Sequence, residues 1–315
     1  MNSLSNVPVL VTGGAGFIGS HLVRALVAAE ADVRVLDNFS HGTRDNLADV
    51  LAKGHVQEGD IRNPDACAAA VRGRTFVFHL AALGSVPASV DDPITYNDVN
   101  IGGTLHILDA ARRAGVKRVV YSASSAAYGD SPVLPKVETM NPSPISPYAV
   151  TKLVGEYYCR VYAQVYGLST ACLRYFNVFG PRQNPKSQYA AVIPAFLATL
   201  LQGRSPTIYG DGEQTRDFCF VQNVVRANLL AALSERPLGG EPINIACGQR
   251  ISLNQMFDLM QSLLHTHIAP TYLPPRAGDV RDSVADIAAA RQLLGFEPAI
   301  LFAQGLELTV ENWSK

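Results

Sequence analysis

A tyrosine and a lysine four residues apart are the first side chains in this sequence that suit chemistry. They are Tyr148 and Lys152, in the segment SPYAVTK. Ser146 in that segment can cap a helix with Pro147 at its first position, which places the phenol and the ammonium on one helical face. A candidate hydroxyl partner, Ser124, follows a β-rich run 24 residues before the tyrosine. This set can hold a substrate hydroxyl and remove its proton.

A glycine-rich segment, TGGAGFIGSHL, follows the first apolar run and begins a helical pattern. Its glycines fit two spacings. Gly14, Gly16 and Gly19 match G-x-G-x-x-G, whereas Gly13, Gly16 and Gly19 match G-x-x-G-x-x-G. Either spacing gives a tight turn, a close approach of the backbone to a pyrophosphate and a helix N-terminus aimed at it. The strand before and the helix after favour a dinucleotide site over an ordinary glycine turn.

Asp37 indicates which dinucleotide would bind. It ends the second β-rich run, 18 residues beyond the last glycine of the motif. A carboxylate there accepts hydrogen bonds from the adenosine ribose and repels a 2′-phosphate, so the sequence favours NAD over NADP. Asp60 and Ile61 follow the third run and can meet the adenine, and Ala81 and Ala82 follow the fourth and leave room for the cofactor. An acidic strand end is also common as a solvated cap.

The tyrosine needs help to act as a base. A free tyrosine has a pKa near 10, so only about 1 in 1000 is ionised at pH 7, and moving that pKa to near 7 requires about 4 kcal/mol. The Lys152 ammonium and a positive nicotinamide ring both favour the phenolate. The plainer alternative is an amphipathic helix face and a turn serine, with Ser122 and Ser125 competing for the role of Ser124.

Alternating elements must position these groups. Short β-rich runs alternate with Ala- and Leu-rich helical stretches at 20–29 and 103–114. This order predicts parallel strands with right-handed crossovers, that is, a doubly wound α/β sheet of the Rossmann type. Ligands of such sheets bind at the carboxyl ends of the strands, near the switch point. The expected strands are 7–11, 32–36, 55–57, 75–80, 118–122 and 170–173.

The pattern loosens after Phe176, where prolines interrupt it, and helical stretches return near 223–233 and 253–264. We predict an NAD-binding domain made of residues 1–177 and 217–248, the second segment returning to the sheet. A smaller α/β substrate-binding lobe then takes residues 178–216 and 249–315.

Composition excludes several classes of protein. The 315 residues carry a formal net charge of -1, without the basic excess of a nucleic-acid binder. Five cysteines without a C-x-x-C pair favour free thiols in a reducing cytosol. The polar start leads directly into an apolar strand, which argues against a cleavable signal, and the apolar stretch 190–201 is too short to span a membrane. His265 and His267 lack a third ligand, so no metal is predicted. We expect a cytoplasmic protein.

Taken together, the segments TGGAGFIG, HLAA, SASSAAYGD, SPYAVTK, RYFNVFGPRQ and RDFCFVQNVV resemble the extended short-chain dehydrogenases/reductases. The resemblance runs from about residue 7 to about 295 and looks closest to UDP-sugar 4-epimerases, particularly the branch acting on UDP-N-acetylglucosamine. It implies that Tyr148 is the base, Ser124 binds the hydroxyl and Lys152 adjusts the pKa of the tyrosine. In that family hydride passes from C4 to bound NAD and returns to the other face of a 4-keto sugar. The resemblance also implies a homodimer through 101–114 and 148–166.

The resemblance further implies substrate contacts. Asn177 would contact phosphate, Arg216 and Arg281 would clamp the diphosphate as arginine forks do, and Asp279 would lie by the uridine ribose. The segment 189–192 would line the sugar and uridine pockets.

The predicted cofactor residues are Gly13, Gly16, Phe17, Ile18, Gly19, Asp37, Asn38, Asp60, Ile61, Leu80, Ala81, Ala82, Asn100, Tyr148, Lys152 and Tyr175. The predicted substrate residues are Gly84, Ser85, Ser124, Ser125, Tyr148, Asn177, Ala191, Val192, Tyr209, Arg216, Asp279, Arg281 and Ser283.

Two features favour an amino-sugar substrate within this resemblance. Gly84 and Ser85 resemble the N-acetyl-accepting branch, and Ser283 stands where members restricted to UDP-glucose and UDP-galactose tend to carry tyrosine. Related 4,6-dehydratases carry an Asp-Glu pair, and UDP-glucuronate decarboxylases a glutamate, where this chain reads Ser125, Ala126 and Ala127. A UDP-uronic acid 4-epimerase needs no such acid and stays an alternative. A non-catalytic dinucleotide-binding sensor is a second alternative, which the complete Ser/Tyr/Lys set disfavours.

Overall fold

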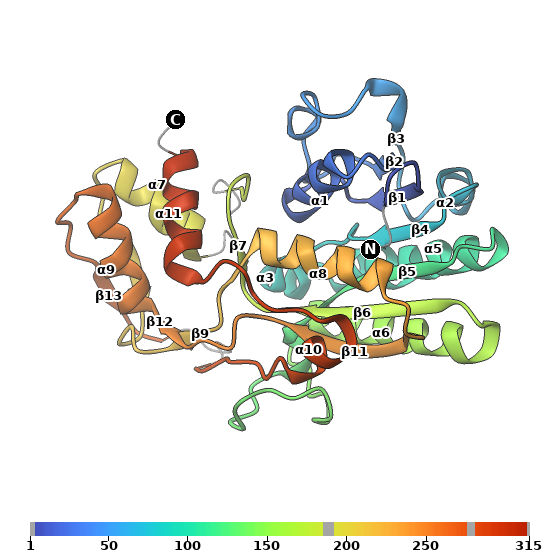
Figure 1. The fold of residues 1–315 in the computed structure, drawn as a ribbon. Helices are drawn as coiled ribbons and strands as arrows, with labels where there is room; N and C mark the ends of the chain where they lie inside the picture. Colours follow the sequence, from blue (N-terminus) through green and yellow to red (C-terminus); the bar gives the residue numbers. More distant parts are fainter. Residues whose placement is uncertain (1–3, 185–191, 276–280, 314–315) are drawn as a thin grey trace.

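The computed structural model describes residues 4–184, 192–275 and 281–313. Its centre is a parallel sheet of seven strands in the order β11-β6-β5-β4-β1-β2-β3 (Figure 1). The six predicted strands are all present, and the segment after 217 returns to the sheet as β11. The doubly wound fold is therefore confirmed. The strands are β1 (Pro8–Thr12), β2 (Asp32–Asp37), β3 (Val56–Glu58), β4 (Phe76–His79), β5 (Arg118–Ser124), β6 (Ser169–Tyr175) and β11 (Gly239–Ile245).

Helices cover both faces of this sheet. One face carries α1 (Phe17–Ala28), α8 (Val221–Leu233) and α10 (Ala288–Leu294), and the other carries α2 (Pro64–Val71), α5 (Gly103–Arg113) and α6 (Pro147–Tyr166). Each face has its own buried apolar cluster, because the strands are apolar on both sides. Short helices connect these elements: α3 (Val86–Asp91), α4 (Pro93–Asn97), the π-turn η3 (Asp98–Gly102) and the 3-10 turns η1 (Arg44–Asn46), η2 (Lys53–His55) and η4 (Ser125–Tyr128).

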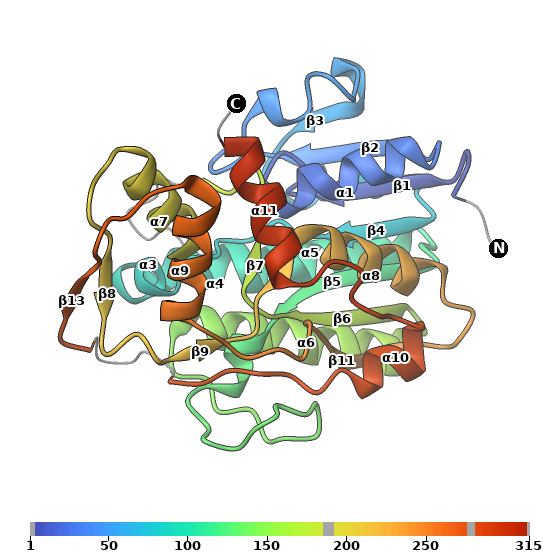
Figure 2. The ribbon, with the colours of Figure 1, turned by 60° about the vertical axis from the view of Figure 1, so that its left-hand side comes forward.

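A smaller lobe lies beside the carboxyl ends of the strands, at the left of Figures 1 and 2. It contains α7 (Val192–Leu201), α9 (Leu253–Leu264) and α11 (Phe302–Trp313). Three two-stranded ladders lie outside the seven-stranded sheet: β7 (Val178–Phe179) with β10 (Cys219–Phe220), β9 (Thr215–Arg216) with β12 (Ile251–Ser252), and β8 (Thr207–Tyr209) with β13 (Thr271–Leu273). A third apolar cluster, rich in phenylalanine, fills the lobe.

The C-terminal segment is shared between the two parts of the molecule. Ile287, Ala290 and Leu294, in and next to α10, belong to the apolar cluster beneath the sheet rather than to the lobe. The predicted lobe segment 249–315 thus returns once to the sheet before α11 enters the lobe. One side of α10 carries small and branched apolar residues. This side faces β11 and α8, which explains why the helix packs against the sheet.

Local sequence sets the start of the helix that carries the candidate tyrosine. The Ser146 side chain accepts a hydrogen bond from the Ala149 amide at 3.2 Å, with Pro147 at the first helical position, as predicted. Gly167 ends the helix in a left-handed conformation. Of the helices in the described ranges, none is both long and apolar enough to cross a bilayer.

Candidate active site

The glycine motif forms a cradle at the carboxyl end of β1. Gly13 has a φ of +69°, and a Cβ there would lie 2.7 Å from the Ala81 amide nitrogen. A Cβ on Gly19 would lie 2.1 Å from the Gly13 carbonyl oxygen, so only glycine lets α1 start this close to the turn. Gly16 caps α1 and is partly exposed.

The structure distinguishes the two glycine spacings. Gly14 is buried, and a Cβ there would meet both methyl carbons of Val35 at 2.8 Å, so its role is packing against β2. The turn residues that stay open are Gly13 and Gly16, which matches G-x-x-G-x-x-G. An open glycine turn at a helix N-terminus fits a pyrophosphate. Phe17 and Ile18, also predicted for the cofactor, form the first turn of α1 behind it.

Carboxylates stand at the next strand ends, as predicted. Asp37 ends β2, is 7% exposed, and accepts hydrogen bonds from the amides of Ala15 (2.9 Å) and Phe39 (2.8 Å). Burial raises the pKa of Asp37. Asp60 accepts from the Asn38 amide group at 2.9 Å and pairs with Arg62 at 2.8 Å, and hydrogen bonding to that arginine lowers the pKa of Asp60 to about 2.

A buried histidine, which sequence reasoning missed, holds the switch point together. His79 ends β4 and is hydrogen-bonded to Thr12 of β1 (2.7 Å) and to Thr104 of α5 (3.0 Å). The Ala81 amide also donates to Thr12, at 3.2 Å. Burial lowers the pKa of His79 to about 3, so the ring is neutral at pH 7. These bonds place the predicted segment 80–82 directly opposite the glycine turn.

Three predicted polar residues are engaged in positioning. The buried Asn100 side chain bonds both backbone groups of Leu83 (2.8 and 3.1 Å) and donates to Thr151 of α6 at 3.0 Å. Ser85, next to Gly84, caps α3, and its amide donates to a tyrosine hydroxyl at 3.1 Å. The Tyr175 hydroxyl is bonded to the Asn228 side chain of α8. Ile61 is buried beneath α5, where a Cβ on Gly103 would lie 2.5 Å from its side chain.

The predicted catalytic side chains meet at the end of β5. The Tyr148 and Ser124 side chains are hydrogen-bonded to each other, and the Lys152 ammonium donates to the Ser122 carbonyl at 2.8 Å. Ser122 thus binds the lysine through its backbone carbonyl, and Ser125 is the first residue of the η4 turn. Of the three serines, Ser124 is the one whose side chain interacts with the phenol, so it stays the predicted partner of Tyr148.

Burial dominates the protonation of this set. It raises the pKa of Tyr148, and the hydrogen bond to Ser124 opposes it. Lys152 is 4% exposed, and burial lowers its pKa to about 8, partly offset by Glu156. The phenol is therefore protonated at neutral pH in the protein alone. The predicted shift toward 7 therefore needs more stabilisation of the phenolate than the protein's own side chains, Lys152 included, supply.

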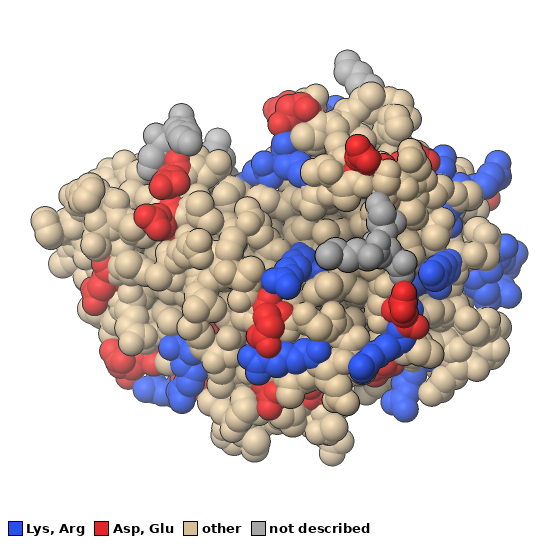
Figure 3. Space-filling model, in the orientation of Figure 1, with Lys and Arg blue, Asp and Glu red and all other residues tan. Residues whose placement is uncertain are grey.

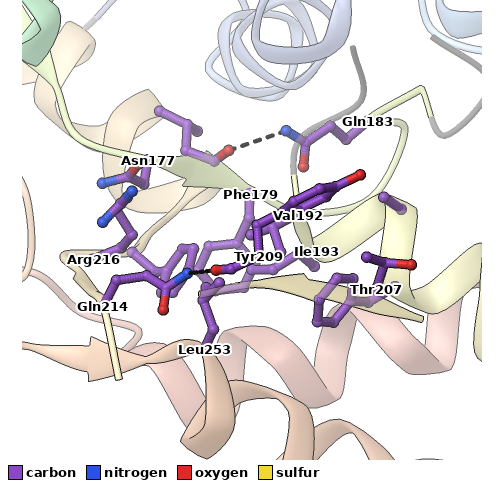
Figure 4. A pocket seen from close by; sticks show the side chains of 14 residues that line it. Asn177, Phe179, Gln183, Val192, Ile193, Thr207, Tyr209, Gln214, Arg216 and Leu253 are labelled. Atoms are coloured by element: carbon purple, nitrogen blue, oxygen red, sulfur yellow. Dashed lines mark hydrogen bonds between the residues drawn. The ribbon is translucent and has the colours of Figure 1, made fainter. Parts of the chain in front are cut away.

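A pocket of about 360 Å³ opens in the lobe, next to the carboxyl end of β6. Four predicted substrate residues line it: Asn177, Val192, Tyr209 and Arg216. Figure 4 shows Asn177 and Arg216 together on one side of it. The Asn177 side chain donates to the Asp217 carbonyl at 3.2 Å, and Arg216 donates to the Thr215 carbonyl at 2.9 Å. An asparagine amide and a guanidinium side by side suit phosphate oxygens.

Other predicted substrate residues lie elsewhere. Arg281 does not line the pocket: its side chain is 67% exposed and pairs with Asp211 at 3.2 Å, while its carbonyl accepts from Arg216 at 3.0 Å. In this structure the backbone of Arg281, rather than its side chain, faces Arg216, so the arginine clamp stays a prediction. The half-buried Ser283 donates its amide to the Thr215 carbonyl at 3.1 Å, beside β9. Ala191 and Asp279 lie outside the described residues.

Sequence reasoning also missed part of the pocket lining. Gln183, Thr207, Gln214 and Phe218 line it, and none was among the predicted substrate residues, although Gln183 and Phe218 lie within the quoted segments RYFNVFGPRQ and RDFCFVQNVV. Thr207 and Tyr209 alternate along β8, a two-residue period that a strand prediction would have revealed.

A second missed residue, Asp217, ties the pocket wall to the sheet. Its fully buried carboxylate accepts from the amides of Cys247 (2.9 Å), Gly248 (3.0 Å) and Ala285 (3.1 Å), and burial raises its pKa to about 6. Within the described ranges, no three His, Cys, Asp or Glu side chains cluster as a metal site would require.

The chain was compared with known proteins. Residues 9–246 match the family model described as "NAD dependent epimerase/dehydratase family". A "Putative UDP-glucose 4-epimerase" of Methanocaldococcus jannaschii is 38% identical over 309 residues, covering 98% of each chain. A UDP-N-acetylglucosamine 4-epimerase of Methanobrevibacter ruminantium, solved with UDP-N-acetylmuramic acid, is 40% identical with a TM-score of 0.93 and covers 98% of this chain and 99% of its own. A UDP-glucose 4-epimerase of Thermotoga maritima, solved with UDP-glucose, is 40% identical with a TM-score of 0.92 and covers 97% and 98%.

Proposed function

The chain belongs to the NAD-dependent epimerase/dehydratase family, and we propose that it epimerises C4 of UDP-hexoses through a transient 4-keto sugar, with UDP-GlcNAc and UDP-GalNAc as its preferred pair. The family membership confirms the resemblance predicted from the motifs. The observation that carries the reaction type is the hydrogen-bonded Ser124–Tyr148 pair at the end of β5, with the buried Lys152 ammonium one helical turn away.

The proposed roles follow from this geometry. Tyr148 would take the proton of the sugar hydroxyl, and Ser124 would hold the same oxygen by a second hydrogen bond. The Lys152 ammonium is buried and bonded to the Ser122 carbonyl, one helical turn from Tyr148. A positive charge fixed there favours the phenolate once a substrate hydroxyl replaces water at the site.

The cofactor site has the residues that NAD requires. Gly13, Gly16 and the N-terminus of α1 would hold the pyrophosphate, and Asp37 would hold the adenosine ribose. Bound NAD supplies reversible hydride acceptance at C4. We expect the denatured protein to release NAD(H) without a 2′-phosphate, as measured by mass spectrometry of the supernatant. Stoichiometric NADP(H) would overturn the role given to Asp37.

The preference for an N-acetylated sugar rests on Ser283. Its amide is bonded to the Thr215 carbonyl in β9, the strand that also carries the pocket residue Arg216, so Ser283 lies close to the pocket. A small residue there leaves space for an acetamido group beside C2. The two solved relatives act on different sugars at the same 40% identity, so overall similarity does not select the substrate.

We also propose that the protein forms a homodimer through α5 and α6. The outer face of α6 exposes Val150, Tyr157, Val161 and Val165, at spacings that place them along one stripe. Ile94 of α4, which packs beside α6, extends this apolar surface. An exposed apolar stripe on a well-packed helix is typical of a protein interface.

One experiment tests the proposed function directly. Purified protein is incubated separately with UDP-GlcNAc, UDP-Glc and UDP-GlcA without added cofactor, and NMR identifies the products. We expect C4 epimers, formed fastest from UDP-GlcNAc. Conversion of UDP-GlcA alone would move the assignment to the uronic-acid epimerases. No conversion of any of the three would support the non-catalytic sensor.

A further inference from the structure

A second hollow lies against the middle of α1, where His21, Arg24 and Ala25 line it. It has a volume of about 690 Å³ and lies between α1, α8 and α11, so it joins the sheet domain to the lobe. It shares no lining residue with the pocket that holds Asn177 and Arg216. This volume is typical of sites for small molecules.

The hollow has an excess of positive charge. Three arginines line it, Arg24, Arg182 and Arg226, against one carboxylate, that of Glu311. Arg24 is paired with Asp49 at 2.6 Å, but its Nε is buried without an acceptor among the described residues. In Figure 3 basic side chains lie over α1 and over α8 on the face that contains the hollow.

Arg182 has the most unused hydrogen-bonding capacity. It follows β7 with a φ of +66°, a backbone conformation that a non-glycine residue adopts at a cost. Its guanidinium contacts the His21 ring nitrogens at 3.4 Å and forms no ion pair with a carboxylate in the described part of the chain. Among the described residues, the hydrogen bond of the Arg226 side chain likewise goes to a backbone carbonyl, that of Glu297, at 3.3 Å.

His21 cannot neutralise this charge. Its Nε2 lies 2.8 Å from the Pro181 carbonyl oxygen, which only accepts, so Nε2 carries the proton and Nδ1 is an acceptor for Arg182. Burial lowers the pKa of His21 to about 4; the bond to the Pro181 carbonyl opposes this shift, and the cations Arg182 and Arg24 contribute to it. The His21 ring is therefore neutral, and it contacts Arg182 without changing the net charge of the hollow.

Apart from the polar side chains of Gln222 and Asn312, the remaining lining is apolar. Ala25, Val225, Leu229 and Leu308 contribute to the walls, together with Phe220. Guanidinium groups beside an apolar wall recognise a phosphate group attached to an apolar or aromatic body, because the forks bind phosphate oxygens and the wall takes the body.

We propose that this hollow, defined by Arg182, Arg226 and the apolar wall of α8 and α11, binds a phosphorylated small molecule of the nucleotide class. The site is separate from the catalytic pocket and does not depend on the proposed reaction. A ligand there would contact α1, whose N-terminus forms the cofactor cradle, and α11 of the lobe at the same time.

The test uses NAD-loaded protein whose catalytic pocket is saturated with UDP. ADP and inorganic pyrophosphate are titrated by calorimetry, while retained NAD is followed by mass spectrometry. We expect one ADP per chain, weaker binding of pyrophosphate because it lacks an apolar body, and a loss of affinity as ionic strength rises. Absence of ADP binding would overturn the proposal, as would ADP uptake that releases an equal amount of NAD.

Variants locate the site. Arg182→Gln should weaken ADP binding by at least about tenfold, since a charged hydrogen bond to phosphate is lost. Gln222→Glu places a negative charge on an exposed lining position with almost no change in shape, and should also weaken binding. It keeps the test decisive if Arg182→Gln does not fold.

Arg236→Gln is the matched control for these variants, because Arg236 is exposed, contacts only a backbone carbonyl through its side chain and lies outside the hollow. It should bind ADP like the unaltered protein. Unchanged affinity in both Arg182→Gln and Gln222→Glu would place ADP elsewhere and refute the proposed site.

Discussion

The dinucleotide cradle and the lobe pocket are built in different ways. The cradle comes from one strand–turn–helix unit, and the backbone itself shapes it, through Gly13 in a left-handed conformation and Gly19 against the Gly13 carbonyl. The pocket collects side chains from Asn177 to Leu253, held by bonds such as those of the buried Asp217 carboxylate. Changes in the cradle and its catalytic neighbours should therefore affect chemistry, and changes in the pocket should affect binding and specificity.

We expect the largest effect on turnover from a change at Tyr148, in the sheet domain. Tyr148→Phe removes the proposed base with little change in shape, and general acid–base groups contribute about 10²–10⁴-fold to turnover. We expect kcat to fall by that factor, with NAD content and UDP-sugar binding largely kept, as measured by NMR turnover and calorimetry. A variant that retained half the kcat of the unaltered enzyme would refute the assignment.

The lobe pocket is tested by two arginines that look alike in the sequence. Arg216→Gln removes a guanidinium that lines the pocket, whereas Arg281→Gln removes one that pairs with Asp211 at the surface. Loss of a charged hydrogen bond costs about 1.5–3 kcal/mol, so Arg216→Gln should raise the Kd for UDP by about tenfold or more.

Arg281→Gln is the matched control, and its Kd should stay within about twofold, as expected for an exposed pair. Calorimetry with UDP measures both values. Equal losses in the two variants would show that Arg281 reaches the diphosphate after all.

We expect substrate specificity to depend on Ser283 rather than on the proposed catalytic residues. Ser283→Tyr fills the space beside C2, and overpacking costs about 1–3 kcal/mol. The ratio of kcat/KM for UDP-GlcNAc to that for UDP-Glc should fall by at least about tenfold. If both substrates lose activity equally, or neither does, the proposed N-acetyl preference loses its main support.

The smallest effect that we expect is a dependence of kcat on pH, caused by Lys152 in the sheet domain. Because burial lowers the pKa of Lys152 to about 8, its ammonium loses its proton as the pH rises through that value. The charge that favours the Tyr148 phenolate is then lost, so kcat should be near half its maximum at about pH 8 and fall further above it. Turnover from pH 6.5 to 9.5 measures this, with circular dichroism at each pH as the control for folding. A kcat that stays constant to pH 9.5 contradicts this role for Lys152.

The sequence predicted the sheet and the catalytic segment because both have local signals. The strand–glycine–helix pattern, the aspartate at the end of β2 and the Y-x-x-x-K spacing each lie within a few turns of one element. The order of elements then determines which strand ends meet. The Ser124–Tyr148 hydrogen bond follows from that order, since β5 and α6 are consecutive elements.

Only the tertiary structure decided the features that depend on long-range packing. It placed the Ser124 side chain beside Tyr148 and turned the Arg281 side chain to the surface. It also brought His79, Thr12 and Thr104 together from three elements. The spacing of residues in the sequence does not reveal that Arg216 lines the pocket and Arg281 does not. The outcome depends on the direction of the backbone around Arg281, which is bonded to the distant strand β9. The local sequence therefore determined what chemistry the chain carries, and the packing of the lobe on the sheet determined which side chains can take part in it.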